Sequence, residues 1–124
     1  MANPNIVNVT TILGNSSQVS LSTTSATSLA SNAASSGKVY KINSIVVANT
    51  NGTAAANITI NNYSAASLGG TAFPVASTIS VPANATLIVT DKTTSYYLLE
   101  NQSIGATAGT ANYLTVTASW EEIN

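Results

Sequence analysis

Apolar and polar residues alternate along much of the chain with a period of two. The clearest example spans residues 54–61, where every second residue is apolar and the residues between them are mostly small and polar. The apolar set consists of Ala54, Ala56, Ile58 and Ile60. This alternation is typical of a β-strand that buries one face. No segment shows an apolar period of 3.6 residues, so the pattern predicts an all-β protein.

The segment with the strongest apolar pattern, residues 39–63, reads as two strands joined at Asn51-Gly52. Asn-Gly favours a tight type I′ turn because both residues tolerate positive φ. The first strand holds a cluster of apolar residues that does not alternate, namely Ile42, Ile45, Val46 and Val47. We therefore expect a hairpin at the centre of the fold, with its first strand buried on both faces.

Further strands are expected on either side of this hairpin. The remaining predicted strands are 6–13, 18–23, 28–30, 72–81, 86–90, 96–99, 103–108 and 113–122. Turns are expected at residues 14–17 and in a loop over 64–71 that contains the Gly69-Gly70 hinge. The strand at 72–81 is expected to point Val75, Ile79 and Val81 inward. The last strand is expected to bury Leu114, Val116, Ala118 and Trp120.

Eight to ten short strands at spacings of about 8–12 residues predict a single antiparallel β-sandwich, either jelly-roll or immunoglobulin-like. The pattern does not separate these two topologies. A chain of 124 residues is expected to form one domain. We expect residues 1–13 to be an N-terminal arm or first strand and residues 14–124 to be the sandwich.

Charged residues make up only 6% of the chain, against about 25% in ordinary soluble domains. The chain has no histidine and no cysteine, which removes the imidazole base of Ser-His-Asp and Cys-His sites and the usual ligands of zinc. The neighbouring Glu121 and Glu122 are expected to point to opposite faces of a strand. We therefore predict no catalytic, cofactor-binding or metal-binding residues, and we expect that the protein is not an enzyme.

Two classes of partner are also disfavoured. Three lysines without any arginine form no basic patch for nucleic acid. The longest strong apolar run is far shorter than the roughly 20 residues of a membrane helix. The first residues, MANPNIVNV, lack the pattern of a secretory signal, so we expect synthesis in a cytoplasm.

A surface with so few charges is prone to association. We therefore expect an oligomer or an assembly component whose sheet edges are covered by neighbours. The N-terminal segment is a candidate for pairing with a neighbour's sheet edge. The candidate interface residues are Ile6, Val7, Val9, Tyr96 and Tyr97. Because Tyr96 and Tyr97 are adjacent on a predicted strand, at least one should face outward, where it would suit a subunit interface or, alternatively, a sugar-stacking surface.

Five stretches that together span most of the chain carry a resemblance, namely MANPNIVNVTTILGN, KVYKINSIVVAN, ISVPANATLIVTDK, YYLLENQSI and TASWEEI. In these stretches the chain resembles a family of small β-rich virion structural proteins of tailed phages that infect marine cyanobacteria. The resemblance implies a place in the phage particle but not which part, and it supplies no catalytic residues.

Within such a particle, the low charge and the need to cover sheet edges lead us to expect a capsid decoration or cement protein on the outer surface of the virion, bound to the major capsid protein and stabilising the head lattice. A trimer is favoured because capsid lattices offer threefold sites and symmetric homo-oligomers are usual. The alternative is a tail- or fibre-associated module that binds host-surface glycan.

Overall fold

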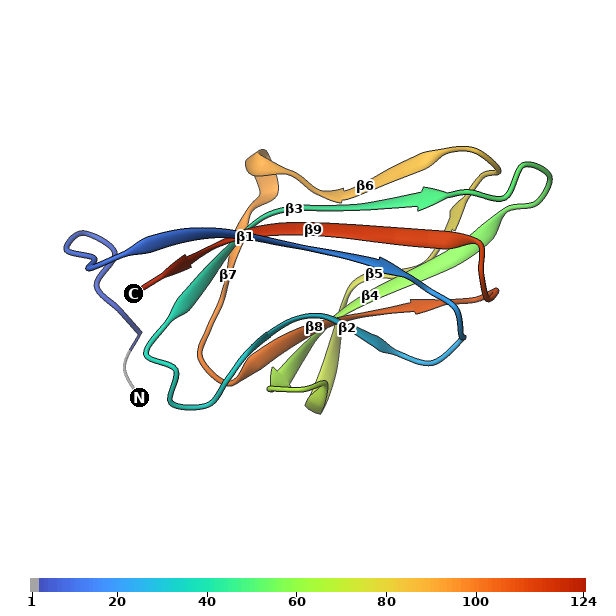
Figure 1. The fold of residues 1–124 in the computed structure, drawn as a ribbon. Helices are drawn as coiled ribbons and strands as arrows, with labels where there is room; N and C mark the ends of the chain where they lie inside the picture. Colours follow the sequence, from blue (N-terminus) through green and yellow to red (C-terminus); the bar gives the residue numbers. More distant parts are fainter. Residues whose placement is uncertain (1–2) are drawn as a thin grey trace.

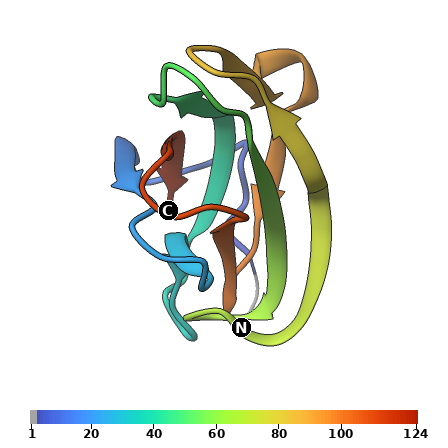
Figure 2. The ribbon, with the colours of Figure 1, turned by 90° about the vertical axis from the view of Figure 1, so that its right-hand side faces the viewer.

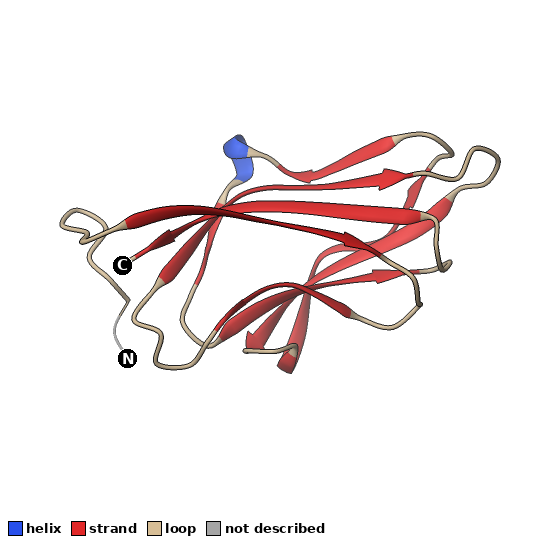
Figure 3. Ribbon diagram, viewed as in Figure 1, coloured by secondary structure: helices blue, strands red, loops and turns tan. Residues whose placement is uncertain are grey.

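The computed structural model describes residues 3–124, which form nine strands and one short 3-10 helix arranged as two packed antiparallel sheets (Figures 1 and 3). The elements are β1 (Ile12–Ser20), β2 (Thr27–Asn32), β3 (Val39–Asn49), β4 (Ala56–Ala65), β5 (Gly69–Val81), β6 (Thr86–Thr90), η1 (Lys92–Thr94), β7 (Tyr96–Leu98), β8 (Gln102–Ala108) and β9 (Leu114–Ile123). The predicted all-β sandwich of eight to ten strands is confirmed.

The order of the strands is that of a jelly roll. One sheet runs β1-β9-β3-β6, with β7 also paired to β3, and the other runs β2-β8-β4-β5. The first strand therefore pairs with the last, the second with the next to last, and so on inward to the β4–β5 hairpin. Nested pairing of this kind, rather than a series of hairpins within each sheet, distinguishes a jelly roll from an immunoglobulin-like sandwich.

The core lies between the inner faces of the two sheets. It is built mainly of β-branched and small apolar side chains, and its largest fully buried members are Leu21, Ile42, Ile45, Ile58, Ile60, Leu98, Ile104 and Leu114. The expected inward faces of β4 and β9 are confirmed, since Ile58, Ile60, Val116 and Ala118 are fully buried. Burying each large aliphatic side chain contributes about 1.5–3 kcal/mol.

The expected hairpin over residues 39–63 is wrong, because β3 and β4 belong to different sheets. Both sides of β3 are occupied by strands from later in the chain, β9 on one side and β6 and β7 on the other. Neither Asn51 nor Gly52 has positive φ, so no type I′ turn forms. Instead the Asn51 side-chain oxygen accepts hydrogen bonds from the backbone N–H of Thr53 and of Ala54, each at 2.8 Å. This local turn carries the chain from one sheet to the other.

Asn49, the last residue of β3, is buried and holds this crossing in place. Its Nδ2 donates to the carbonyl oxygens of Ala54, at 3.0 Å, and Val81, at 2.9 Å. Its Oδ1 accepts from the backbone N–H of Asn51 at 2.9 Å. A single buried amide thus joins the end of β3, the crossing loop and the end of β5.

Strand β3 is central, as expected, but the expectation that it is buried on both faces is wrong. Ile42 and Ile45 are fully buried although they lie three residues apart, because the register against β9 shifts after Ile42 and leaves Asn43 without a partner. This bulge brings both side chains to the inner face. Val46, on the outer face, is only half-buried. The irregular pattern reflects a bulge rather than two buried faces.

The first strand begins later than expected. Residues 6–9 form a turn and bend, and β1 instead spans Ile12–Ser20 through the predicted turn at 14–17. It pairs with β9 over nine consecutive residues, from Ile12 opposite Ile123 to Ser20 opposite Thr115. The central strand β9 provides a long regular partner, and this overrides the local turn preference of Gly14 to Ser17. The expected division at residue 13 falls within β1.

The expected burial of Val75 and Ile79 is wrong, although that of Val81 is confirmed. The predicted Gly69-Gly70 hinge begins β5, an edge strand whose register against β4 shifts three times. Val75 lies in one of these shifts, between Pro74 and Ala76, and is not paired. Ile79 lies opposite the buried Ile58 but remains partly exposed because no strand of the described residues flanks β5 on its outer side.

Candidate interaction surfaces

The N-terminal candidates lie on a segment that is fastened to the end of β9. The backbone N–H groups of Thr10 and Thr11 donate to the Asn124 carbonyl oxygen at 2.6 and 3.1 Å, and the Asn124 N–H donates to the Thr11 oxygen at 2.9 Å. This segment and the C-terminus therefore lie at the same end of the sandwich (Figure 1). Ile6 and Val7 are exposed, Val7 to 91%, whereas Val9 is half-buried.

Of the five predicted interface residues, Ile6 and Tyr97 come together. Both line a shallow, largely apolar hollow of about 240 Å³. Its other lining residues are Asn3, Pro4, Val39 and Leu99. Val7, Val9 and Tyr96 do not line this hollow, so the five candidates do not form one surface.

Tyr96 and Tyr97 face opposite ways, as the sequence predicts for adjacent strand residues. Tyr97 is 45% exposed, whereas Tyr96 packs against the core and its hydroxyl donates to Asn62 Oδ1 at 3.0 Å. Burial raises the pKa of the Tyr96 phenol to about 12, and the hydrogen bond with Asn62 opposes the shift only in part. Tyr96 is therefore a structural residue in the isolated chain, and Tyr97 is the tyrosine of this pair available to a partner.

The pKa of Tyr96 predicts a loss of stability at high pH. The folded chain keeps the phenol protonated up to about pH 12, whereas an unfolded chain ionises near 10, so the free energy of unfolding should fall between these values. Urea unfolding of wild type and Tyr96→Phe at several pH values measures this effect. Tyr96→Phe should lose less stability over the window than wild type; part of the fall should remain, because burial also raises the pKa of Tyr40. Tyr97→Phe serves as the matched control and should follow wild type.

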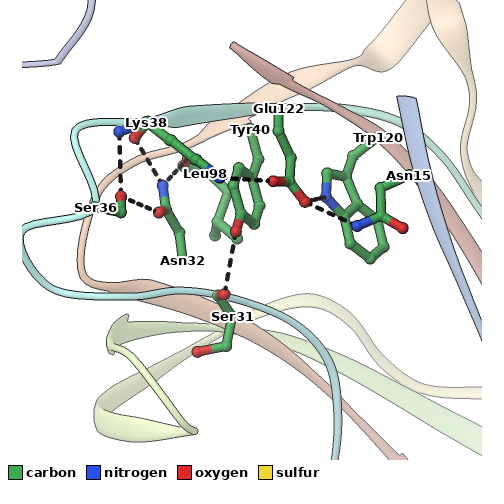
Figure 4. Close-up of polar contacts among 9 residues, drawn as sticks. All are labelled: Asn15, Ser31, Asn32, Ser36, Lys38, Tyr40, Leu98, Trp120 and Glu122. Carbon is green, nitrogen blue, oxygen red and sulfur yellow. Dashed lines mark hydrogen bonds and ion pairs between the residues drawn. The ribbon is translucent and has the colours of Figure 1, made fainter. Parts of the chain in front are cut away.

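A polar cluster at the inner face links β1 to β9 (Figure 4). The Glu122 carboxylate accepts from Asn15 Nδ2 at 2.8 Å and Trp120 Nε1 at 3.2 Å, and it pairs with Lys38 Nζ at 3.3 Å. Burial alone would raise the pKa of Glu122, but these hydrogen bonds and the charge of Lys38 together lower it. Glu122 therefore stays ionised at neutral pH and ties Asn15, on the edge strand, to the neighbouring strand.

The sandwich has an edge strand on each side of each sheet: β1 and the β6–β7 pair in one sheet, β2 and β5 in the other. In Figure 2, β1 (blue) and β5 (yellow-green) lie on opposite sides of the molecule. An exposed edge can template pairing with another chain, and proteins usually blunt it with short strands, bulges, proline or charge.

Three of these edges are blunted. Strand β2 has six residues and a register shift, and β6 and β7 are short strands separated by η1. Strand β5 is long, but it contains Pro74, register shifts and Thr78 at a φ of 52°. Each of these features interrupts the regular row of donors and acceptors that an added strand needs.

The β1 edge has none of these protective features. It has no proline, no charged residue and no register shift over nine residues. Ile12 and Leu13 are more than half exposed on it. The local pattern of the Gly-Asn-Ser-Ser stretch at 14–17 favours a turn and therefore hides this edge in the sequence. The absence of charge over residues 12–20 was the available signal.

Within residues 3–124, no group of three or more acidic side chains gathers in a way that would hold a metal ion. In the same described range, no helix has the length and apolar character needed to cross a membrane.

No protein-family model and no curated protein matches this chain. Among solved structures, it is similar to a protein of Bacillus endospore appendages, which are described as a novel family of disulfide-linked pili. The TM-score is 0.50 and the identity 19%, over 91% of this chain and 87% of the other. At this identity the similarity shows a shared fold only.

Proposed function

We propose that this chain is a non-enzymatic structural protein of a tailed-phage particle, attached to the outside of the head as a decoration protein. The observation that supports this proposal best is the unprotected β1 edge in a chain with only three lysines and four acidic residues. A regular, uncharged edge suits permanent burial against a neighbour better than exposure in a free monomer. The sequence resemblance to cyanophage virion proteins supports the phage context.

The fold is compatible with this role but does not specify it. Jelly rolls occur in viral capsid domains and in lectins, so the role must be inferred from surfaces. The pili of the structural neighbour are disulfide-linked, whereas this chain has no cysteine. Its association with neighbours, whether further copies of the chain or other virion proteins, would therefore depend on main-chain pairing and apolar contacts.

Attachment of this kind should resist salt. Few charges are available for ion pairs with a partner, and an ion-pair interface would be screened at about 1 M salt, where the Debye length is about 3 Å. Purified particles washed at rising salt concentration should retain the protein in the pelleted fraction. Release at moderate salt, measured against retention of the major capsid protein, would contradict this mode of attachment.

The copy number of the chain in intact particles tests its location. Quantitative mass spectrometry, with the major capsid protein as internal standard, should find hundreds of copies if the chain decorates the head lattice. A few to tens of copies would place it in the tail, neck or fibre. Its absence from purified particles would overturn the proposal.

One observation favours a second candidate, a tail- or fibre-associated module that binds host-surface glycan. The exposed Tyr97 lies beside Leu99, which also lines a second, mostly polar hollow of about 430 Å³. Polar residues in that lining are Asn3, Ser35, Ser64, Glu100, Asn101 and Gln102. An aromatic face beside amides and hydroxyls suits sugar binding. Glycan-array binding that is lost in Tyr97→Ala but kept in Tyr113→Ala would support this candidate.

A further inference from the structure

The hydrogen bonds at both ends of β1 define which of its backbone groups are free for pairing. The N–H and carbonyl of Thr11 both bond to Asn124, and the N–H of Leu21 bonds to the Leu114 oxygen. In an antiparallel ladder these bonds recur at every second residue, so odd-numbered residues of β1 bond to β9. The backbone groups of the even-numbered residues, Ile12, Gly14, Ser16, Gln18 and Ser20, point away from β9. No strand within residues 3–124 pairs with that side.

We propose that the β1 edge pairs with β1 of a second copy of this chain, antiparallel about a two-fold axis at Ser16, so that one sheet continues across both copies. This inference goes beyond the proposed function and does not depend on the particle in which the chain resides. It yields a two-fold dimer rather than the trimer expected from lattice symmetry, because antiparallel pairing of identical strands generates an isologous interface.

Charge favours a second copy as the occupant. Residues 12–20 carry no ionisable side chain, so two β1 edges can meet without like-charge repulsion. For the same reason, the β1 edge has no charge that would attract a strand with charged side chains. The other three edges of a second copy are blunted by short strands, bulges or proline. Its β1 is therefore the best-matched strand that another copy can present.

The side chains are also self-complementary in this register. With Ser16 opposite Ser16 of the second copy, Leu13 lies opposite Val19 of the second copy, and the symmetry repeats the contact. Leu13 and Val19 share the inner face of β1, where Val19 packs against the core and Leu13 is 57% exposed. Pairing therefore covers the exposed Leu13 with an apolar neighbour on each side of the axis.

One local contact has to open for this pairing. The outward N–H of Ser16 donates to the side-chain oxygen of Asn15 at 2.8 Å in the single chain. A strand from a second copy replaces this bond with a main-chain bond. The interface consists of a single strand pair. The fraction of dimer should therefore rise with protein concentration, as for any reversible association.

A cysteine cross-link tests the register directly, because the chain contains no other cysteine. Residues opposite each other in a hydrogen-bonded antiparallel pair have Cα atoms about 5.5 Å apart, and their Cβ atoms are too far apart for an unstrained disulfide but within reach of a short bismaleimide. Full-length Ser16→Cys treated with such a cross-linker should form a covalent dimer. The matched control, Ser80→Cys, places a thiol on the exposed and blunted β5 edge and should remain monomeric on a non-reducing gel.

Charge at the axis provides a second test that does not depend on cross-linking. In sedimentation velocity, wild type should dimerise as its concentration rises, and Ser80→Lys should behave like wild type. Ser16→Lys and Ser16→Glu should each lose dimerisation, because two like charges face each other at the axis. An equimolar mixture of the two variants should recover it. Circular dichroism checks that each variant is folded, as expected for an exposed position.

Three results would overturn the inference: a wild-type chain that stays monomeric up to its solubility limit, a dimer that persists in Ser16→Lys, or Ser16→Cys cross-linking no better than Ser80→Cys. A monomeric chain whose β1 edge is covered in the particle by a strand of a different protein would equally overturn the assignment of a second copy.

Discussion

Replacing Trp120 by alanine is expected to lower the free energy of unfolding by about 3–5 kcal/mol, measured by urea denaturation. Trp120 is only 6% exposed and stacks on Tyr40, with ring centroids 6.0 Å apart and the planes inclined by 17°. Its indole N–H also donates to Glu122. The substitution therefore leaves a cavity beside Tyr40 and removes one hydrogen bond of the cluster that links β1 to β9.

Two further variants separate packing from other effects. Tyr97→Ala removes an aromatic ring from an exposed position and should change stability by no more than about 0.5 kcal/mol. Trp120→Phe keeps a ring but loses the donor to Glu122, so it should cost less than Trp120→Ala. Equal losses in Trp120→Ala and Tyr97→Ala would show that Trp120 does not pack in the core as described.

Replacing the buried Asn49 by alanine is expected to cost about 3 kcal/mol, although it removes little apolar surface. The change leaves the carbonyls of Ala54 and Val81 and the N–H of Asn51 without their partner, and an unsatisfied buried polar group costs about 1–3 kcal/mol. The same urea denaturation experiment measures the loss. The hydrogen bonds that are lost hold the crossing of the chain from β3 to β4, and this crossing places the two strands in different sheets.

Asn57→Ala is the matched control for Asn49→Ala, because it makes the same chemical change at an exposed position of β4. It should alter the free energy of unfolding by less than about 0.5 kcal/mol. Asn49→Asp tests the mechanism further, since a carboxylate cannot donate to two carbonyls. If Asn49→Asp matched wild type in stability, the hydrogen bonds to Ala54 and Val81 would not be what holds the crossing.

The interaction surfaces could be predicted only in part. The split between Tyr96 and Tyr97 follows from strand geometry and was predictable. The β1 edge was not predictable, because an edge is defined by the strand that is absent beside it. Residues 12–20 are recognised as unprotected only once β9 is seen on one side and no strand of residues 3–124 on the other.

Local residue patterns were enough to predict that the protein is built of strands and, in β4 and β9, which side chains face inward. Alternation is a local property, because successive residues of any strand point to opposite faces. The predicted strand at 86–90 therefore coincides with β6, and the inward residues of β4 and β9 were correctly assigned.

The pairing of the strands and the positions of their register shifts depend on contacts across the whole fold. Pairing depends on residues far apart in the chain: β9 occupies one side of β3 and β6 and β7 the other, so β4 joins the other sheet in spite of the Asn51-Gly52 signal. Bulges at Asn43 and Val75 change the face of neighbouring residues, and they form against partner strands rather than from local preference. The physical reason is that the ladder of hydrogen bonds in a sheet is a contact between distant segments, whereas alternation belongs to each segment alone.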